Sequence, residues 1–119
     1  YFHRLRLAVW SVVRERPAVF VGRGADLILP RQQGLRVRIV APREACVESF
    51  AQRYGLSIEK ARAQRDRVEA ERAGLVRSHF RYEPNDPTRY DVIVNLGAFS
   101  VPDAIGIILT AARARHLIS

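Results

Sequence analysis

The sequence has almost no lysine, although it is strongly basic. Lys60 is the one lysine among 20 basic side chains, so nearly all of the formal charge of +8 comes from arginine. A charge balance of this kind favours phosphorylated or polyanionic partners. Nucleotides, nucleic acid and acidic lipid all belong to that class, and the charge does not choose among them.

Residues that ligate metals or form disulfides are also scarce. Cys46 is the one cysteine, which excludes a disulfide or a multi-cysteine metal site within the chain. His3, His79 and His116 are scattered, with no carboxylate or cysteine at ligand spacing, so we expect no metal site. The lone cysteine fits a reducing compartment, and we expect a cytoplasmic protein.

Long apolar runs are missing as well. No stretch has the length needed to span a bilayer, and the first residues begin an amphipathic segment without signal-peptide architecture, so we expect no membrane partner. A length of 119 residues with 48% hydrophobic content suits one compact unit. Because the chain starts without Met, we expect residues 1–119 to be a single partial domain cut from a longer protein.

Helical and strand patterns alternate along the sequence. Helices are predicted over residues 1–16, 43–54 and 58–80 and again after Ser100, with Gly55 suited to the left-handed end of the second helix. Strands are predicted over residues 18–21, 35–40 and 91–95. Strands that alternate with helices pair in parallel, so the expected fold is α/β, a parallel sheet with flanking helices.

An arginine between two glycines follows the first predicted strand, in Gly22-Arg23-Gly24. The guanidinium presents a planar fork of donors that matches phosphate oxygens, and the glycines remove the Cβ atoms that would keep a ligand from the backbone. Arg23 is therefore a candidate phosphate-binding residue. The alternative is an ordinary strand-to-loop turn with a solvated arginine.

The long predicted helix carries a second candidate, Arg65-x-x-x-Glu69-x-x-Arg72. At 100° per residue these three side chains share one face. They lie beside an apolar stripe made of Ile58, Ala61, Val68 and Leu75. The charges are therefore expected at the edge of the core, and the alternative is a set of ion pairs on a solvated face.

Four segments in a fixed order carry a resemblance over nearly the whole chain. They are Val-Gly-Arg-Gly-Ala-x-x-Ile-Leu, Leu-Arg-Val-Arg-Ile-Val-Ala-Pro-Arg-Glu, the arginine-rich helix, and Asp86-Pro87-x-x-Tyr90-Asp91-x-x-x-Asn95. Together they resemble the cytidylate kinase-like family of P-loop nucleoside monophosphate kinases. The resemblance implies a P-loop NTPase fold and transfer of the γ-phosphoryl group of ATP to CMP or a related monophosphate.

The resemblance also implies roles for single residues. Arg23, Arg65 and Arg72 match the family's positions that face the acceptor phosphate. Glu69 takes the place of the family's Asp near the nucleoside, and it is one methylene longer, so the nucleoside that is recognised stays open. A nucleoside monophosphate is the implied partner, with ATP and Mg²⁺ as cofactors of the full-length parent, and no catalytic residue is assigned within this chain.

The sequence departs from the family at several places. Gly24 stands where classical cytidylate kinases have Asp. Cys46 falls where many relatives carry a lid Arg, and its alternative interpretation is a small residue packed on a helix. No Gly-x-x-x-x-Gly-Lys-Ser/Thr pattern occurs, so a cradle for the ATP phosphates is lacking. In the resembling fold, the strand before that loop lies between the strands that match residues 18–21 and 35–40.

We therefore expect the C-terminal portion of a kinase whose N-terminal strands are missing. Alone it should be inactive and should bind ATP and Mg²⁺ poorly, and the missing N-terminal segment would be its partner. A non-catalytic nucleotide-sensing or interaction module of the same fold is the alternative. Nucleic-acid binding rests on charge alone and is not favoured, because the aromatic residues do not form stacking platforms among the basic ones.

Overall fold

The four predicted helices and two of the three predicted strands occur in the order that the sequence predicts. A computed structural model describes residues 2–21, 28–80 and 85–119. Its helices are α1 (Phe2–Glu15), α3 (Arg43–Tyr54), α4 (Ile58–Phe80) and α5 (Val101–Ala114), with short 3₁₀ turns η1 (Arg31–Gln33) and η2 (Pro87–Arg89) and strands β1 (Val37–Val40) and β2 (Val92–Asn95). Within these ranges, none of the helices combines the length and apolar character that a membrane span requires.

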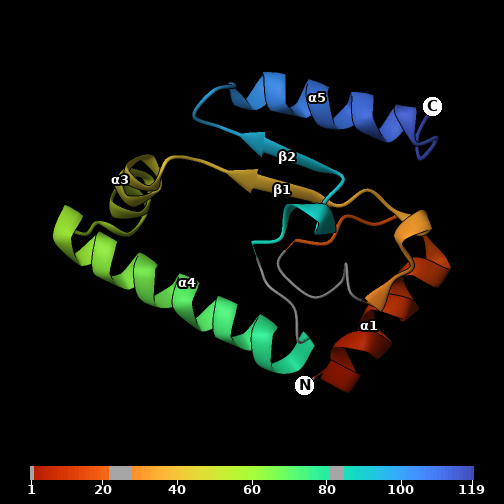
Figure 1. Cartoon of the computed structure of the whole chain (residues 1–119), viewed down its shortest axis with the longest axis horizontal. Helices are drawn as coiled ribbons and strands as arrows, with labels where there is room; N and C mark the ends of the chain where they lie inside the picture. The colour runs from red at the N-terminus through yellow and green to blue at the C-terminus, as the bar shows by residue number, and fades with distance from the viewer. Residues whose placement is uncertain (1, 22–27, 81–84) are drawn as a thin grey trace.

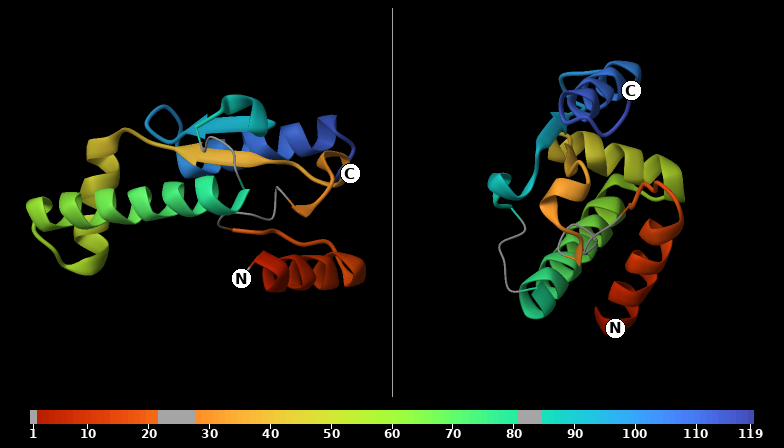
Figure 2. Two further views of the ribbon diagram at one scale, coloured as in Figure 1. Left: turned by 60° about the horizontal axis from the view of Figure 1, so that its bottom comes forward. Right: turned by 90° about the vertical axis from the view of Figure 1, so that its right-hand side faces the viewer.

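The two strands form a parallel pair. Val37 lies opposite Val92, and Val40 lies opposite Asn95. The expected α/β class with parallel pairing is thereby confirmed, since α3 and α4 supply the crossover that parallel strands need. Figures 1 and 2 show the pair between α5 on one side and α4 on the other, with both strands running toward α3.

The prediction of a strand over residues 18–21 is wrong. This segment has no regular secondary structure, and its valines point into solvent, with Val19 91% and Val21 97% exposed. A β-branched run has the side chains of a strand, but it becomes one only when a neighbouring strand satisfies its backbone groups. Within the described residues, the sheet contains β1 and β2 alone.

Helices α3 and α4 form as predicted because capping residues stand where α3 ends and α4 begins. Gly55 ends α3 in the left-handed region at φ 64°, and its N–H donates to the carbonyl of Ala51. The Ser57 hydroxyl then accepts the N–H of Lys60 at 3.2 Å, which caps the first turn of α4. The two helices bury Val47, Ala51 and Ala61 between them, with Phe50 and Leu56 packed against this cluster.

Helix α5 covers the face of the strand pair that is turned away from α4. Ser100 caps it by accepting the N–H of Asp103 at 3.2 Å, as the sequence predicts. Val94 on β2 and Ala104 on α5 are both buried, 2% and 4% exposed. Alternation along β2 therefore turns Val94 toward α5 and leaves Ile93, 44% exposed, on the opposite face.

The carboxylate of Asp91 joins four segments at the amino end of the sheet. It accepts the backbone N–H of Arg36 at 2.8 Å, the guanidinium of Arg115 at 2.9 Å and that of Arg31 at 3.4 Å. Arg115 donates in addition to the carbonyl of Gly34 at 2.8 Å. The start of β1, the start of β2, the η1 loop and the end of α5 are thus held by one side chain.

The electrostatic balance at Asp91 favours its charged form. Burial, the largest effect, raises the pKa of this carboxyl, but the Arg36 N–H and the charges of Arg115 and Arg31 together outweigh it, and the pKa lies below its ordinary value. A carboxyl with a lowered folded-state pKa stabilises the protein above its unfolded-state pKa. That stabilisation is lost as the pH falls through the folded-state pKa.

Replacing Asp91 should therefore destabilise the protein in a pH-dependent way. We expect Asp91→Asn to lower the free energy of unfolding by roughly 1–3 kcal/mol at neutral pH, since charged hydrogen bonds are lost. The difference from the wild type should shrink as the pH falls below the unfolded-state pKa of about 3.9 and through the lower folded-state pKa of Asp91. Urea unfolding followed by circular dichroism across this pH range tests both points, with Glu48→Gln at an exposed position of α3 as the control. A difference that does not depend on pH would contradict this account.

Two glycines provide a matched test of packing. A Cβ on Gly97 would lie 2.6 Å from Cδ of Pro42, whereas a Cβ on Gly106 in α5 would meet nothing within 4 Å. We expect Gly97→Ala to cost about 1–3 kcal/mol, because the Pro42 ring is stiff. Gly106→Ala should stabilise the protein by up to about 1 kcal/mol through helix propensity. Equal stabilities of the two variants in urea melts would show that the turn after β2 relaxes freely.

Candidate functional site

The α3–α4 hairpin stands at the carboxyl ends of the parallel strands, which is where open α/β sheets bind ligands. Its two helices are clamped by ion pairs near that edge. Arg62 donates to Glu44 at 2.8 Å, and Arg43 bonds Asp66. The hydrogen bond and the charge of Asp66 raise the pKa of Arg43 above its ordinary value.

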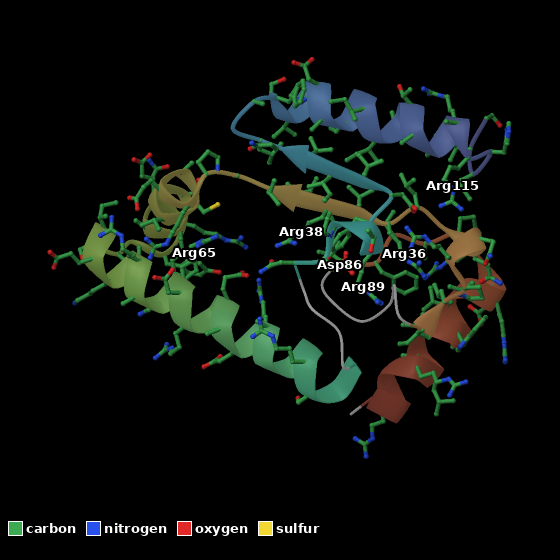
Figure 3. The ribbon with its side chains drawn as sticks, viewed as in Figure 1. Arg36, Arg38, Arg65, Asp86, Arg89 and Arg115 are labelled. Carbon is green, nitrogen blue, oxygen red and sulfur yellow. The ribbon has the colours of Figure 1, made fainter. Side chains whose placement is uncertain are left out.

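The predicted triad on α4 has the expected placement. Arg65, Glu69 and Arg72 fall within roughly 60° of one another around the helix. The side chain of Arg65 is 25% exposed and extends from α4 toward the sheet (Figure 3), with its Nη1 atom 3.9 Å from Asp66. Glu69 and Arg72 share this face of α4 with Arg65.

The members of this triad differ in what they contact. Arg72 donates to Glu69 at 3.3 Å, and both side chains are about half exposed. This is the i,i+3 ion pair that the alternative interpretation expects, and such exposed pairs contribute little to stability. Arg65 is more enclosed than the other two side chains. The structure thus brings the three residues to one face of α4.

Arg23 lies outside the described residues, as do both of its flanking glycines. Its approach to the α4 triad therefore stays a prediction. The preceding residues 18–21 form no strand, so the expectation that Arg23 follows a strand end does not hold in this structure.

A basic residue on β1 was not singled out from the sequence. Arg38 extends from β1 toward α4 in Figure 3. Its Nη2 atom donates to Oδ1 of Asn85 at 3.0 Å, and its guanidinium lies 5.6 Å from the centre of the Tyr90 ring. The alternation of Val37, Arg38 and Ile39 was a usable signal, because a charged residue within a short buried strand pattern marks the face that is not core.

The segment before β2 is shaped by local hydrogen bonds. Asp86 accepts the hydroxyl of Thr88 at 2.7 Å and its N–H at 2.9 Å, which begins the η2 turn. These two bonds from Thr88 hold the pKa of Asp86 below its ordinary value. Figure 3 shows Asp86 and Arg89 on this turn, between the strands and α4. The Asp-Pro pattern therefore fixes the backbone that presents Asn85 and Tyr90 to Arg38.

Metal and thiol chemistry find little support in the described ranges. Over these residues, no group of three or more His, Cys, Asp or Glu side chains is close enough to hold a metal ion. The thiol of Cys46 donates weakly to the carbonyl of Ala41 at 3.7 Å. This contact is local and fits a small residue packed at the beginning of α3.

Comparison with protein families adds to the geometry. The sequence profile of the cytidylate kinase-like family matches residues 1–98. The chain belongs to the cytidylate kinase-like family. The matched range contains Arg23, the triad on α4 and the whole strand pair, and it ends before α5. No curated protein matches the sequence significantly. Family membership indicates a kinase-like phosphotransferase as the class of function and nucleotides as the class of ligand.

Proposed function

We propose that this chain is the acceptor-binding portion of a nucleoside monophosphate kinase-like phosphotransferase with a P-loop NTPase fold. The full protein would transfer the γ-phosphoryl group of ATP to CMP or a related monophosphate. The observation that carries the proposal is the face of α4 that Arg65, Glu69 and Arg72 share, from which Arg65 extends toward the parallel sheet.

The roles follow from the chemistry of each group. Arg65 and Arg72 would bind the acceptor phosphate through charge-assisted hydrogen bonds, and Arg23 would join them from the glycine-flanked loop. The carboxylate of Glu69 would accept hydrogen bonds from the nucleoside. Phosphoryl transfer depends mainly on positioning and on neutralising charge, so arginines at these places supply what the reaction needs from the acceptor side.

The donor side needs residues that this chain does not have. A P-loop pattern is absent from its sequence, and the described residues offer no cluster of acidic ligands for Mg²⁺. ATP and Mg²⁺ do not fit the residues present, so we propose that a segment of the parent outside these 119 residues holds them. Two features agree with a further strand beside β1: residues 18–21 are unpaired with the sheet, and within the described part β1 is hydrogen-bonded as a strand to β2 alone.

Binding of CMP should depend on the face of α4 and not on its overall charge. We expect Arg65→Ala and Arg72→Ala to weaken CMP binding to the chain by roughly ten- to hundredfold, because each removes a hydrogen bond to a charged group. Arg67→Ala is the matched control, since Arg67 lies on the opposite side of the same helix. Isothermal titration with CMP measures all three. Equal, small effects would mean that these arginines form a solvated face.

Phosphoryl transfer should be absent without the donor segment. We expect no ATP-dependent conversion of CMP to CDP by residues 1–119 with Mg²⁺, because no phosphate cradle is available. Nucleotide chromatography of the reaction mixture measures the products. Turnover that copurifies with the chain through repeated purification, and that Arg72→Ala abolishes, would refute the assignment of the donor site to another segment.

A further inference from the structure

Helix α5 is apolar on its outer side as well as on the side that packs on the sheet. Ala104 is buried, whereas Ile105 is 52% and Leu109 39% exposed. Asp103 and Arg113 are the only charged residues of this helix. A surface helix normally carries polar side chains away from the core, and a helix that is apolar around its circumference is normally buried. The outer side of α5 therefore has the composition of a contact surface.

The exposed apolar side chains of α5 form a row. Val101, Ile105 and Leu109 are spaced by four residues, so they follow one another along the helix. Rows of this spacing are the ridges that fit between the side chains of a second helix. Figure 1 shows α5 at the top of the molecule, with the strands beneath it. The described elements thus leave this row exposed, and an exposed apolar row of this kind marks an interaction surface.

The two charges of α5 are complementary to those of a second, antiparallel α5. Asp103 lies in the first turn and Arg113 in the last, about 15 Å apart along the axis. Arg113 donates through Nε to the carbonyl of Ser119 at 3.4 Å, and in the described part of the chain neither charged side chain forms an ion pair. In an antiparallel pair, Asp103 of each copy lies level with the partner's Arg113, and Ile105 lies within about one turn of the partner's Leu109.

We propose that the outer side of α5 is a homodimer interface, in which the α5 helices of two copies pack antiparallel across a two-fold axis. Such an interface uses the same surface of both copies, so each interaction occurs twice. Ile105 and Leu109 supply the apolar contact, and the two Asp103–Arg113 pairs fix the antiparallel direction. This inference goes beyond the proposed function. Because α5 covers the face of the strand pair turned away from α4, the dimer leaves the face with Arg65 free.

Charge reversal tests the partner and its direction together. Sedimentation equilibrium should show a dimer of the wild-type chain at micromolar concentrations. Asp103→Arg and Arg113→Asp should each weaken self-association roughly tenfold, because both pairs become like-charged. An equimolar mixture of these two variants should recover most of the wild-type affinity, since each charge then meets its opposite in the mixed dimer. Glu48→Arg, at an exposed position of α3, is the control and should dimerise like the wild type.

A further variant tests the apolar contact. Leu109→Glu should make the chain monomeric while its circular dichroism spectrum stays that of the wild type, because Leu109 is on the exposed side of α5. A wild type that stays monomeric throughout the micromolar range would overturn this inference and leave the outer side of α5 to a different occupant. Single charge reversals that dimerise like the wild type, or a mixture that recovers no affinity, would overturn it as well.

Discussion

The arrangement of this molecule depends on one carboxylate, that of Asp91. Residues 55 and 24 positions away converge on it, through the N–H of Arg36 and the guanidinium of Arg115. A four-residue parallel pair has few hydrogen bonds of its own, so its alignment needs support at its ends. Because Asp91 sets where β1 begins relative to β2, it also sets which side chains of β1 point toward α4.

The face of β1 that is turned toward α4 depends on that alignment. With Val37 opposite Val92, the register sends Arg38 away from α5 and toward the helix that carries Arg65. A shift of one residue would exchange Arg38 with Ile39 and place a charge against α5. The ion pairs between α3 and α4 act at the other end of the strands, where they hold the hairpin together beside the carboxyl edge.

Much of the fold could be predicted from local signals. Gly55, Ser57 and Ser100 mark helix ends through contacts with residues at most four positions away, so the sequence pattern contains the whole interaction. Residues 18–21 show the limit of this reasoning. Their composition favours a strand, but pairing is a long-range interaction, and no neighbouring strand is present in the described residues to complete it.

The sequence by itself determined the helix boundaries, the α/β class, the basic charge and the shared face of Arg65, Glu69 and Arg72, because each follows from the period of a helix or the chemistry of a cap. It also carried the family's segments in order, from which the role of a phosphotransferase was inferred. Only the tertiary structure decided which distant segments the arginines join. Arg38 meets Asn85 across 47 positions of the chain, and Arg115 meets Gly34 across 81. Contacts of that separation depend on register and on the packing of whole elements, which local sequence patterns do not encode.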